Sequence, residues 1–179
     1  MYTWQDFIKI TNESDLRAFV LEVIYSHKQT SLYEYAKEAD LYDKQKNVTI
    51  NEYTKKIYKL SGEPVVDFTS SNAKIASNFF HRLNVQRCTY SLGNGVTFSK
   101  DGVKEKLGKD FDTKFKKAGY NAIIHGLTFL FWNVNTFYNF KITEFVPLFD
   151  EFTGELMAGI RFWQLDDDKP MIIDRKSVV

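Results

Sequence analysis

Three histidines, His27, His81 and His125, are the side chains of this 179-residue sequence best suited to metal binding or proton transfer. A zinc site needs a second histidine, cysteine or carboxylate at one of a few short spacings. None of the three histidines has such a neighbour in the sequence. We therefore expect each to be a surface or helix-end residue, and we predict no metal site and no catalytic histidine.

The single cysteine, Cys88, could act as a nucleophile if a histidine activated it. His81 is the nearest histidine, but on a helix it would stand about 10 Å away along the axis, too far for a hydrogen bond. A lone cysteine also cannot form an internal disulfide, and Cys88 falls within a helical pattern. We predict a small buried hydrophobic side chain in a protein of a reducing compartment.

Two glycine-containing stretches resemble nucleotide-binding loops but differ from them in spacing. The stretch Gly102–Lys109 has one residue too many between its glycines for a phosphate loop, and Asp110 stands where a serine or threonine should bind magnesium. Gly93-Asn94-Gly95 lacks the third glycine of a dinucleotide fingerprint and follows a predicted helix, whereas the fingerprint follows a strand. We predict a turn there and no cofactor.

Two charged clusters could bind ions. The carboxylates Asp166, Asp167 and Asp168 could hold a hard cation, although three consecutive acids at the end of a strand are more typical of a solvated turn. A lysine-rich region could contact phosphates. Its members are Lys100, Lys104, Lys106, Lys109, Lys114, Lys116 and Lys117. We favour a solvated helical face with intra-helical ion pairs, because no arginine and few exposed aromatic side chains interleave with the lysines.

Composition excludes several classes of protein. Hydrophobic residues make up 44% of the chain and aromatic residues 16%, which indicates a packed core or interface and not a disordered chain. The net charge of +1 gives no whole-chain attraction to nucleic acid or to anionic membrane. No apolar run approaches about 18 residues, and the first residues lack the pattern of a secretory signal. We predict no membrane segment.

Helical periodicity organises the N-terminal part. Between Asp15 and about Lys28, apolar residues recur at intervals of three and four residues, which predicts a helix. The same spacing occurs between Leu32 and Tyr42. The segment Asp43–Thr49 is polar, and we expect it to be exposed. A third, shorter helical piece is predicted from Tyr53 to Leu60, ending at Ser61-Gly62.

The strongest helical pattern begins at Asn72. Ser70, Ser71 or Asn72 can cap this helix, and Gly93 suits a left-handed helix end. Its apolar residues form two opposite stripes, so we expect a central helix packed between other elements. The stripes are Ile75, Ala76, Phe79, Phe80, Leu83 and Tyr90, and Val85, Cys88 and Leu92. After a turn at Asn94-Gly95, Val96–Phe98 is predicted to be a short strand.

The remainder combines one more helical region with several strands. Residues Val103 to His125 keep a helical spacing interrupted near Gly108, and Gly126 can end that helix. Strands are then predicted over Thr128–Trp132, Tyr138–Thr143, Phe145–Phe149, Leu156–Leu165 and Met171–Ile173. The aromatic run Phe129–Trp132 lacks flanking basic residues, which favours a buried strand over a base-stacking surface. Pro147 indicates an edge strand, because proline cannot donate to a ladder.

These elements predict an α+β fold, with N-terminal helices and a long central helix followed by an antiparallel β-meander. We expect two parts: a helical N-terminal arm over residues 1–62 and an α+β region over residues 63–179.

Three blocks of sequence, in order, resemble the portal proteins of tailed bacteriophages. The first block is N-x-x-I-x-x-N-F-F in Asn72–Phe80, followed by T-Y-S-L-G-N-G-V-T-F in Thr89–Phe98. The second is Leu107–Asp112, followed by Ala122–Phe129. The third is Phe145–Asp150, followed by Ala158–Trp163. In that family the blocks correspond to a helix with a Tyr-x-x-Gly turn and a short strand, a helix-Gly-strand passage, and a Pro-containing strand with a turn and an Ile-Arg-aromatic strand.

The resemblance implies a structural protein without enzymatic activity of its own. Portal proteins form rings, usually dodecamers, at one capsid vertex of the virion, after assembly in the host cytoplasm. A separate terminase motor drives double-stranded DNA through the ring during packaging, and the DNA leaves by the same conduit. The implied partners are other copies of the chain, terminase, scaffold, capsid and head-tail adaptor proteins, and the DNA. The α+β region would belong to the outer wing of the subunit.

Portal proteins are longer than this chain, so we expect a truncated or frame-shifted product or an expressed fragment, with apolar surface left exposed. Two other functions stay open. One is a stand-alone phage or prophage protein-interaction module without a DNA-channel role. The other is an enzyme with a composite site that uses His125 and Asp166–Asp168, for which retained metal or a bound ligand would be required.

Overall fold

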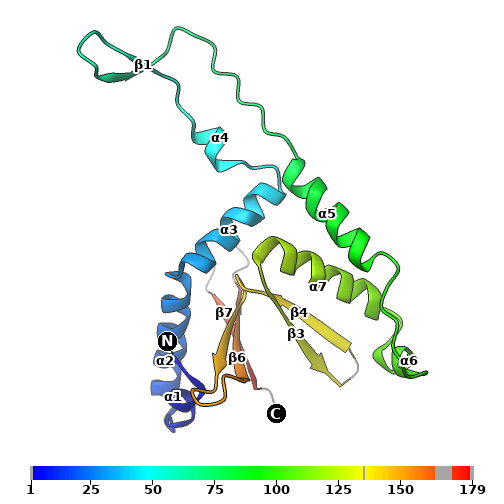
Figure 1. The fold of residues 1–179 in the computed structure, drawn as a ribbon. Coiled ribbons are helices and arrows are strands. Elements are labelled where there is room, and N and C mark those ends of the chain that lie inside the picture. Colours follow the sequence, from blue (N-terminus) through cyan, green and yellow to red (C-terminus); the bar gives the residue numbers. More distant parts are fainter. Residues whose placement is uncertain (1, 135, 164–170, 178–179) are drawn as a thin grey trace.

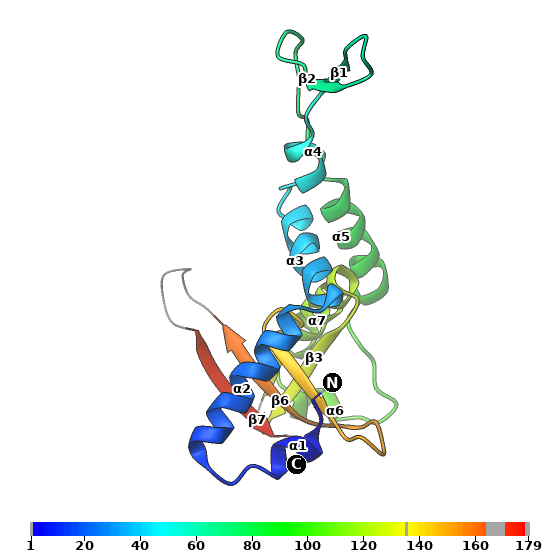
Figure 2. The ribbon, with the colours of Figure 1, turned by 90° about the vertical axis from the view of Figure 1, so that its left-hand side faces the viewer.

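The chain has an α+β fold in which helices accompany small antiparallel sheets (Figure 1). The structure is a computed structural model, and it describes residues 2–134, 136–163 and 171–177. In both views the sheets lie at one end of the molecule and a two-stranded hairpin projects from the other (Figures 1 and 2). The predicted charged turn at Asp166–Lys169 and the end of the strand predicted to reach Leu165 lie outside the described residues.

The N-terminal helices are α1 (Trp4–Ile8), α2 (Glu13–Lys28) and α3 (Ser31–Asp43). The side chain of Asn12 accepts a hydrogen bond from the backbone N–H of Ser14 at the start of α2, and Thr30 accepts one from Tyr33 at the start of α3. These local caps satisfy donors that the first helical turn leaves unpaired. The two longer predicted helices are confirmed to within two residues at each end.

The predicted helical piece over Tyr53–Leu60 is wrong. A short helix, α4 (Val48–Glu52), precedes this segment, which contributes β1 (Lys56–Tyr58) to an antiparallel hairpin with β2 (Pro64–Val66). Ile57 lies opposite Val65 in this hairpin, and β-branched side chains favour such cross-strand pairs. The turn between the strands uses Gly62 at a φ of 81°, where a residue with a side chain would be strained.

Helix α5 (Phe79–Leu92) begins seven residues later than predicted, and the segment before it is hydrogen-bonded to residues 45–53. The Gln45 amide donates to the Ala76 carbonyl, and the Asn72 amide donates to the Tyr53 carbonyl. Lys74 donates to the Asn51 carbonyl. Residues 72–76, which make these bonds to a distant part of the chain, lie outside the helix, and Asn78 is the residue that precedes its first turn.

The end of α5 also differs from prediction. Gly93 has a right-handed φ of −64°, and the left-handed conformation belongs to Gly95, at a φ of 76°. The segment Val96–Phe98 forms no strand. Its backbone is instead bonded to the next helices, since Asp112 accepts from the Val96 N–H and Lys104 donates to the Val96 carbonyl. A nearby side-chain partner therefore replaces strand pairing here.

The lysine-rich region forms α6 (Val103–Leu107) and α7 (Phe111–His125), with the predicted interruption at Gly108. Gly126 ends α7 at a φ of 82°, which confirms the predicted glycine stop. The α7 helix packs along β3 (Thr128–Asn133) and β4 (Thr136–Lys141), an antiparallel pair. Phe111 of α7 contacts Phe115 and Phe137 at ring-centroid distances of 5.5 and 5.6 Å.

The remaining strands are β5 (Phe145–Phe149), β6 (Leu156–Trp163) and β7 (Ile172–Ser177), in the order β5-β6-β7. All neighbours are antiparallel, and β5 with Pro147 stands at an edge, as predicted. The predicted meander is divided into a two-stranded and a three-stranded sheet, since β4 and β5 are not paired. A tight turn from Lys141 to Glu144 separates them.

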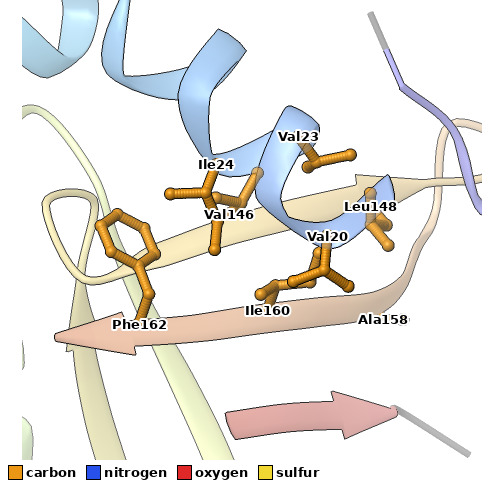
Figure 3. Packing of buried hydrophobic residues seen from close by; sticks show 8 residues of the cluster. All are labelled: Val20, Val23, Ile24, Val146, Leu148, Ala158, Ile160 and Phe162. Atoms are coloured by element: carbon orange, nitrogen blue, oxygen red, sulfur yellow. The ribbon is translucent and has the colours of Figure 1, made fainter. Parts of the chain in front are cut away.

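The main core lies between α2 and the three-stranded sheet (Figure 3). Val20, Val23 and Ile24 of α2 point toward β5 and β6, where Ile160 has no exposed surface. The cluster is completed by Val146, Leu148, Ala158 and Phe162. This core joins residues from both sides of the predicted boundary at residue 62, so α2 is held to the sheet by burial of apolar surface.

Candidate functional site

The first polar cluster joins the end of α7 to α3 and β4. Nε2 of His125 lies 3.0 Å from Oδ1 of Asp40, and Nζ of Lys141 lies 3.1 Å from the same oxygen. Partial burial raises the pKa of the Asp40 carboxyl, but hydrogen bonds from His125 and Lys141 outweigh this effect and lower that pKa to about 2. The charged carboxylate therefore holds two cationic or donor groups from distant elements.

His125 is buried, contrary to the expected surface position, although it does stand at a helix end. Its side chain has no exposed surface, and Nδ1 has no hydrogen-bond partner among the described residues. The Asp40 carboxylate can compensate the desolvation of the ring at Nε2.

The second polar cluster lies one turn farther along α3. Nδ1 of His81 lies 3.0 Å from Oδ1 of Asp43, and the Tyr120 hydroxyl donates to that oxygen over 2.5 Å. Desolvation and the hydrogen bond to Asp43 raise the pKa of Tyr120, so its hydroxyl remains a donor at neutral pH. Asp43 was expected in an exposed polar segment, and this expectation is wrong because α5 and α7 both direct donors to it.

Together the two clusters connect α3 to α5, α7 and β4. Each carboxylate accepts from a histidine and from one further side chain, an arrangement that also occurs in acid–base sites. Neither cluster brings a cysteine, serine or threonine nucleophile within hydrogen-bond distance of its histidine in the contacts described. The geometry therefore supports a role in positioning the helices.

The other two chemical candidates also have packing roles. Cys88 is buried, as predicted, and its thiol donates to the Lys116 carbonyl over 3.4 Å. Nε2 of His27 lies 2.8 Å from the Ile142 carbonyl oxygen. Burial lowers the pKa of His27, and the hydrogen bond to Ile142 opposes that shift. In the part of the chain that the structure describes, no group of three or more His, Cys, Asp and Glu side chains could hold a metal ion.

The lysine-rich region contains a specific ion pair. Nζ of Lys104 lies 2.6 Å from Oδ2 of Asp112 and joins α6 to α7. This pair links two helices, whereas intra-helical pairs were expected. Among the strand aromatics, Phe129 packs on Phe145 at a centroid distance of 4.6 Å, but Trp132 is 40% exposed. The prediction of a buried strand is therefore wrong, since no residue of β3 is buried and Leu130 is also 42% exposed.

One exposed apolar surface lies on α5, where two buried apolar stripes were predicted. Cys88 is the buried residue of this helix, whereas Phe79 is 66% exposed, Leu83 61% and Tyr90 94%. Arg82 and Arg87 lie among these residues, and α5 has no acidic side chain. We call this set, Phe79, Arg82, Leu83, Arg87 and Tyr90, the α5 face. A shallow pocket of about 600 Å³ opens beside it between His81 and Tyr90.

Sequence reasoning missed Asp40, Asp43, Tyr120 and Lys141. One signal was available: Asp40 and Asp43 follow Ala36 by four and seven residues, so they lie on the side of α3 that Ala36 buries. An acidic residue on a buried helical side requires a donor. The identity of the donor, however, depends on contacts between residues that are 38 to 101 positions apart.

No protein-family model matches the chain, and no curated protein matches its sequence. Among the described residues, no helix is long and apolar enough to cross a membrane. The α5 face is therefore the feature on which a function can be argued, because a large apolar patch with a polar rim is typical of a protein–protein contact site.

Proposed function

We propose that this chain is a structural subunit of a tailed-phage portal ring. In that role it forms part of the conduit at the capsid vertex through which double-stranded DNA is packaged and ejected, and it has no enzymatic activity of its own. The observation that carries the proposal is the α5 face, whose apolar side chains remain exposed within a single copy. Such a surface requires a partner.

The arrangement of the later elements supports the same proposal. In the second block the resemblance implies a helix, a glycine and a strand, and the chain has α7, Gly126 and β3 in that order. In the third block it implies a Pro-containing strand, a turn and an Ile-Arg-aromatic strand. The corresponding elements are β5 with Pro147, a turn at 150–154, and β6 with Ile160–Phe162.

The proposal implies particular partners and a location. Other copies of the chain would complete the ring, and terminase, scaffold, capsid and head-tail adaptor proteins would bind the parent assembly. The ring would stand at the portal vertex of the virion after assembly in the host cytoplasm.

The test is the mass and shape of the purified chain. Mass photometry and negative-stain electron microscopy should show closed rings, with a dodecamer as the reference size. A chain that stays monomeric across the accessible concentration range would overturn the ring proposal. It would favour the alternative of a stand-alone phage or prophage interaction module.

A further inference from the structure

Two stretches of the chain carry opposite net charge. The stretch 13–43, which contains α2 and α3, has seven acidic and three basic residues. The stretch 79–125, which contains α5, α6 and α7, has nine basic and four acidic residues. Figure 1 shows α2 along one edge and α5 and α6 along the other, while α3 reaches α5, where Tyr42 contacts Phe80 at a ring-centroid distance of 6.2 Å. The net charge of the whole chain is therefore small because an acidic stretch and a basic stretch largely cancel.

The acidic stretch also exposes apolar side chains. Tyr25 is 67% exposed on α2 and Tyr35 is 69% exposed on α3, and both lie near exposed glutamates. We call the set Leu21, Tyr25, Glu34, Tyr35 and Glu38 the α2–α3 face. Like the α5 face, it combines large apolar side chains with charged ones, and the exposed Lys37 lies between its two glutamates.

We propose that the α5 face of one copy binds the α2–α3 face of the next copy. This inference rests on the proposed ring, for which it names the contact surfaces. Arg82 and Arg87 would meet Glu34 and Glu38, while Phe79, Leu83 and Tyr90 pack against the tyrosines and Leu21. Because the two faces differ, the contact is head-to-tail, and repetition of a head-to-tail contact produces a ring when its rotation closes.

The size and chemistry of both faces fit a second copy. A buried aromatic side chain contributes about 150–250 Å², so two aromatic residues with neighbouring leucine and arginine stems supply much of the roughly 800 Å² per partner that a specific interface buries. Apolar side chains occupy both faces beside the charges. This pattern favours a protein with a matching apolar surface over nucleic acid, for which phosphate contacts dominate the affinity.

The test exchanges the charges of the two faces in the full chain. Variant A carries Arg82→Glu and Arg87→Glu, and variant B carries Glu34→Arg and Glu38→Arg. Each variant alone places like charges together, so its Kd for self-association should rise by at least about tenfold. A mixture of A and B restores opposite charges at both contacts and should recover the wild-type Kd.

A matched control places the same two changes of charge outside both faces. Lys46→Glu with Lys56→Glu reverses two exposed lysines and should leave the Kd unchanged. Sedimentation velocity measures association, and circular dichroism with thermal unfolding verifies that each variant keeps its fold. A variant that loses its fold is replaced by the milder Arg82→Gln with Arg87→Gln, or Glu34→Gln with Glu38→Gln.

The outcomes separate this inference from the proposed ring. Rings that form equally well in A and B would overturn the inference and leave the ring proposal intact. Association that follows the charge exchange but gives open chains would support the inference and overturn the ring. A monomeric wild-type chain would overturn the inference. The inference would also be overturned if variant A self-associates normally but no longer binds a short DNA duplex. That result would show that the α5 face binds nucleic acid.

Discussion

The ring of Phe145 lies directly against Gly159. A Cβ atom added at Gly159 would stand 1.8 Å from Cζ of Phe145, far inside van der Waals contact. Phe145 is buried, and its ring also packs on Phe129 and stacks on Phe140 at centroid distances of 4.6 and 5.5 Å. Through this side chain the sheet of β3 and β4 is joined to the sheet of β5 to β7.

Gly159→Ala should therefore lower the free energy of unfolding by about 1–3 kcal/mol, because the added methyl group would displace a buried ring that packs on Phe129 and Phe140. Chemical denaturation measures this loss. Gly119→Ala is the matched control, since its Cβ would stand 2.4 Å from Cδ1 of Leu92, the end of a flexible side chain that can rotate away, and alanine also favours the helix. Equal losses in the two variants would contradict the proposed role of Phe145.

Asp40→Asn should destabilise the protein by about 1–3 kcal/mol, because it removes the charge that His125 and Lys141 share. Lys44→Gln, an exposed change at the residue that follows α3, should cost less than about 0.5 kcal/mol. Urea titration at neutral pH measures both. A loss of similar size in the two variants would argue against a structural role for the Asp40 cluster.

The contribution of Asp40 should disappear in acid. Its folded-state pKa of about 2 lies below the usual aspartate value, so its stabilising effect is complete above about pH 4 and is lost as the pH falls through 2. The difference in unfolding free energy between the wild type and Asp40→Asn should shrink over that range. Comparing the two chains cancels the effects of other aspartates. A difference that stays constant from pH 7 to pH 2 would contradict the assigned shift.

The elements that could be predicted from sequence are those with local signals. Helices α2, α3 and α7 have apolar periodicity together with a capping side chain or a terminal glycine, and their positions follow from residues within one or two turns. The edge position of β5 could also be predicted from a local signal, because Pro147 has no backbone N–H to donate to a neighbouring strand.

The incorrect predictions concern segments whose structure depends on contacts with a distant part of the chain. The periodicity of 72–78 is helical, yet this segment lies outside α5, where the Ala76 carbonyl accepts from Gln45 and the Lys74 side chain donates to the Asn51 carbonyl. The exposure of Phe79 and Leu83 could not be predicted either, since an apolar stripe indicates burial without indicating which molecule supplies the covering surface. The candidate contact surface therefore became visible only in the structure, although the sequence had indicated its apolar residues Phe79, Leu83 and Tyr90.

Ile24→Ala should cost about 2–5 kcal/mol, because Ile24 is 1% exposed and packs in the core between α2 and the sheet of β5 to β7. Arg17→Ala, on an exposed position of the same helix, serves as the control and should change stability by less than about 0.5 kcal/mol. Thermal and chemical unfolding should give one transition for both variants. A separate transition for α2 would indicate that the N-terminal helices form an independent unit.

Replacing Thr54–Phe68 with a short Gly-Ser linker should leave the melting temperature within about 2 °C of the wild type. The buried hydrophobic residues of the described chain all lie outside this segment, whereas Tyr58, Leu60 and Phe68 within it are largely exposed. The Asn72 amide already bonds to the Tyr53 carbonyl, so the two ends are close enough for the linker. Differential scanning calorimetry measures the transition. A fall of more than about 5 °C would show that the hairpin stabilises the fold, whereas an unchanged transition with higher solubility would show that its apolar side chains serve no contact within their own chain.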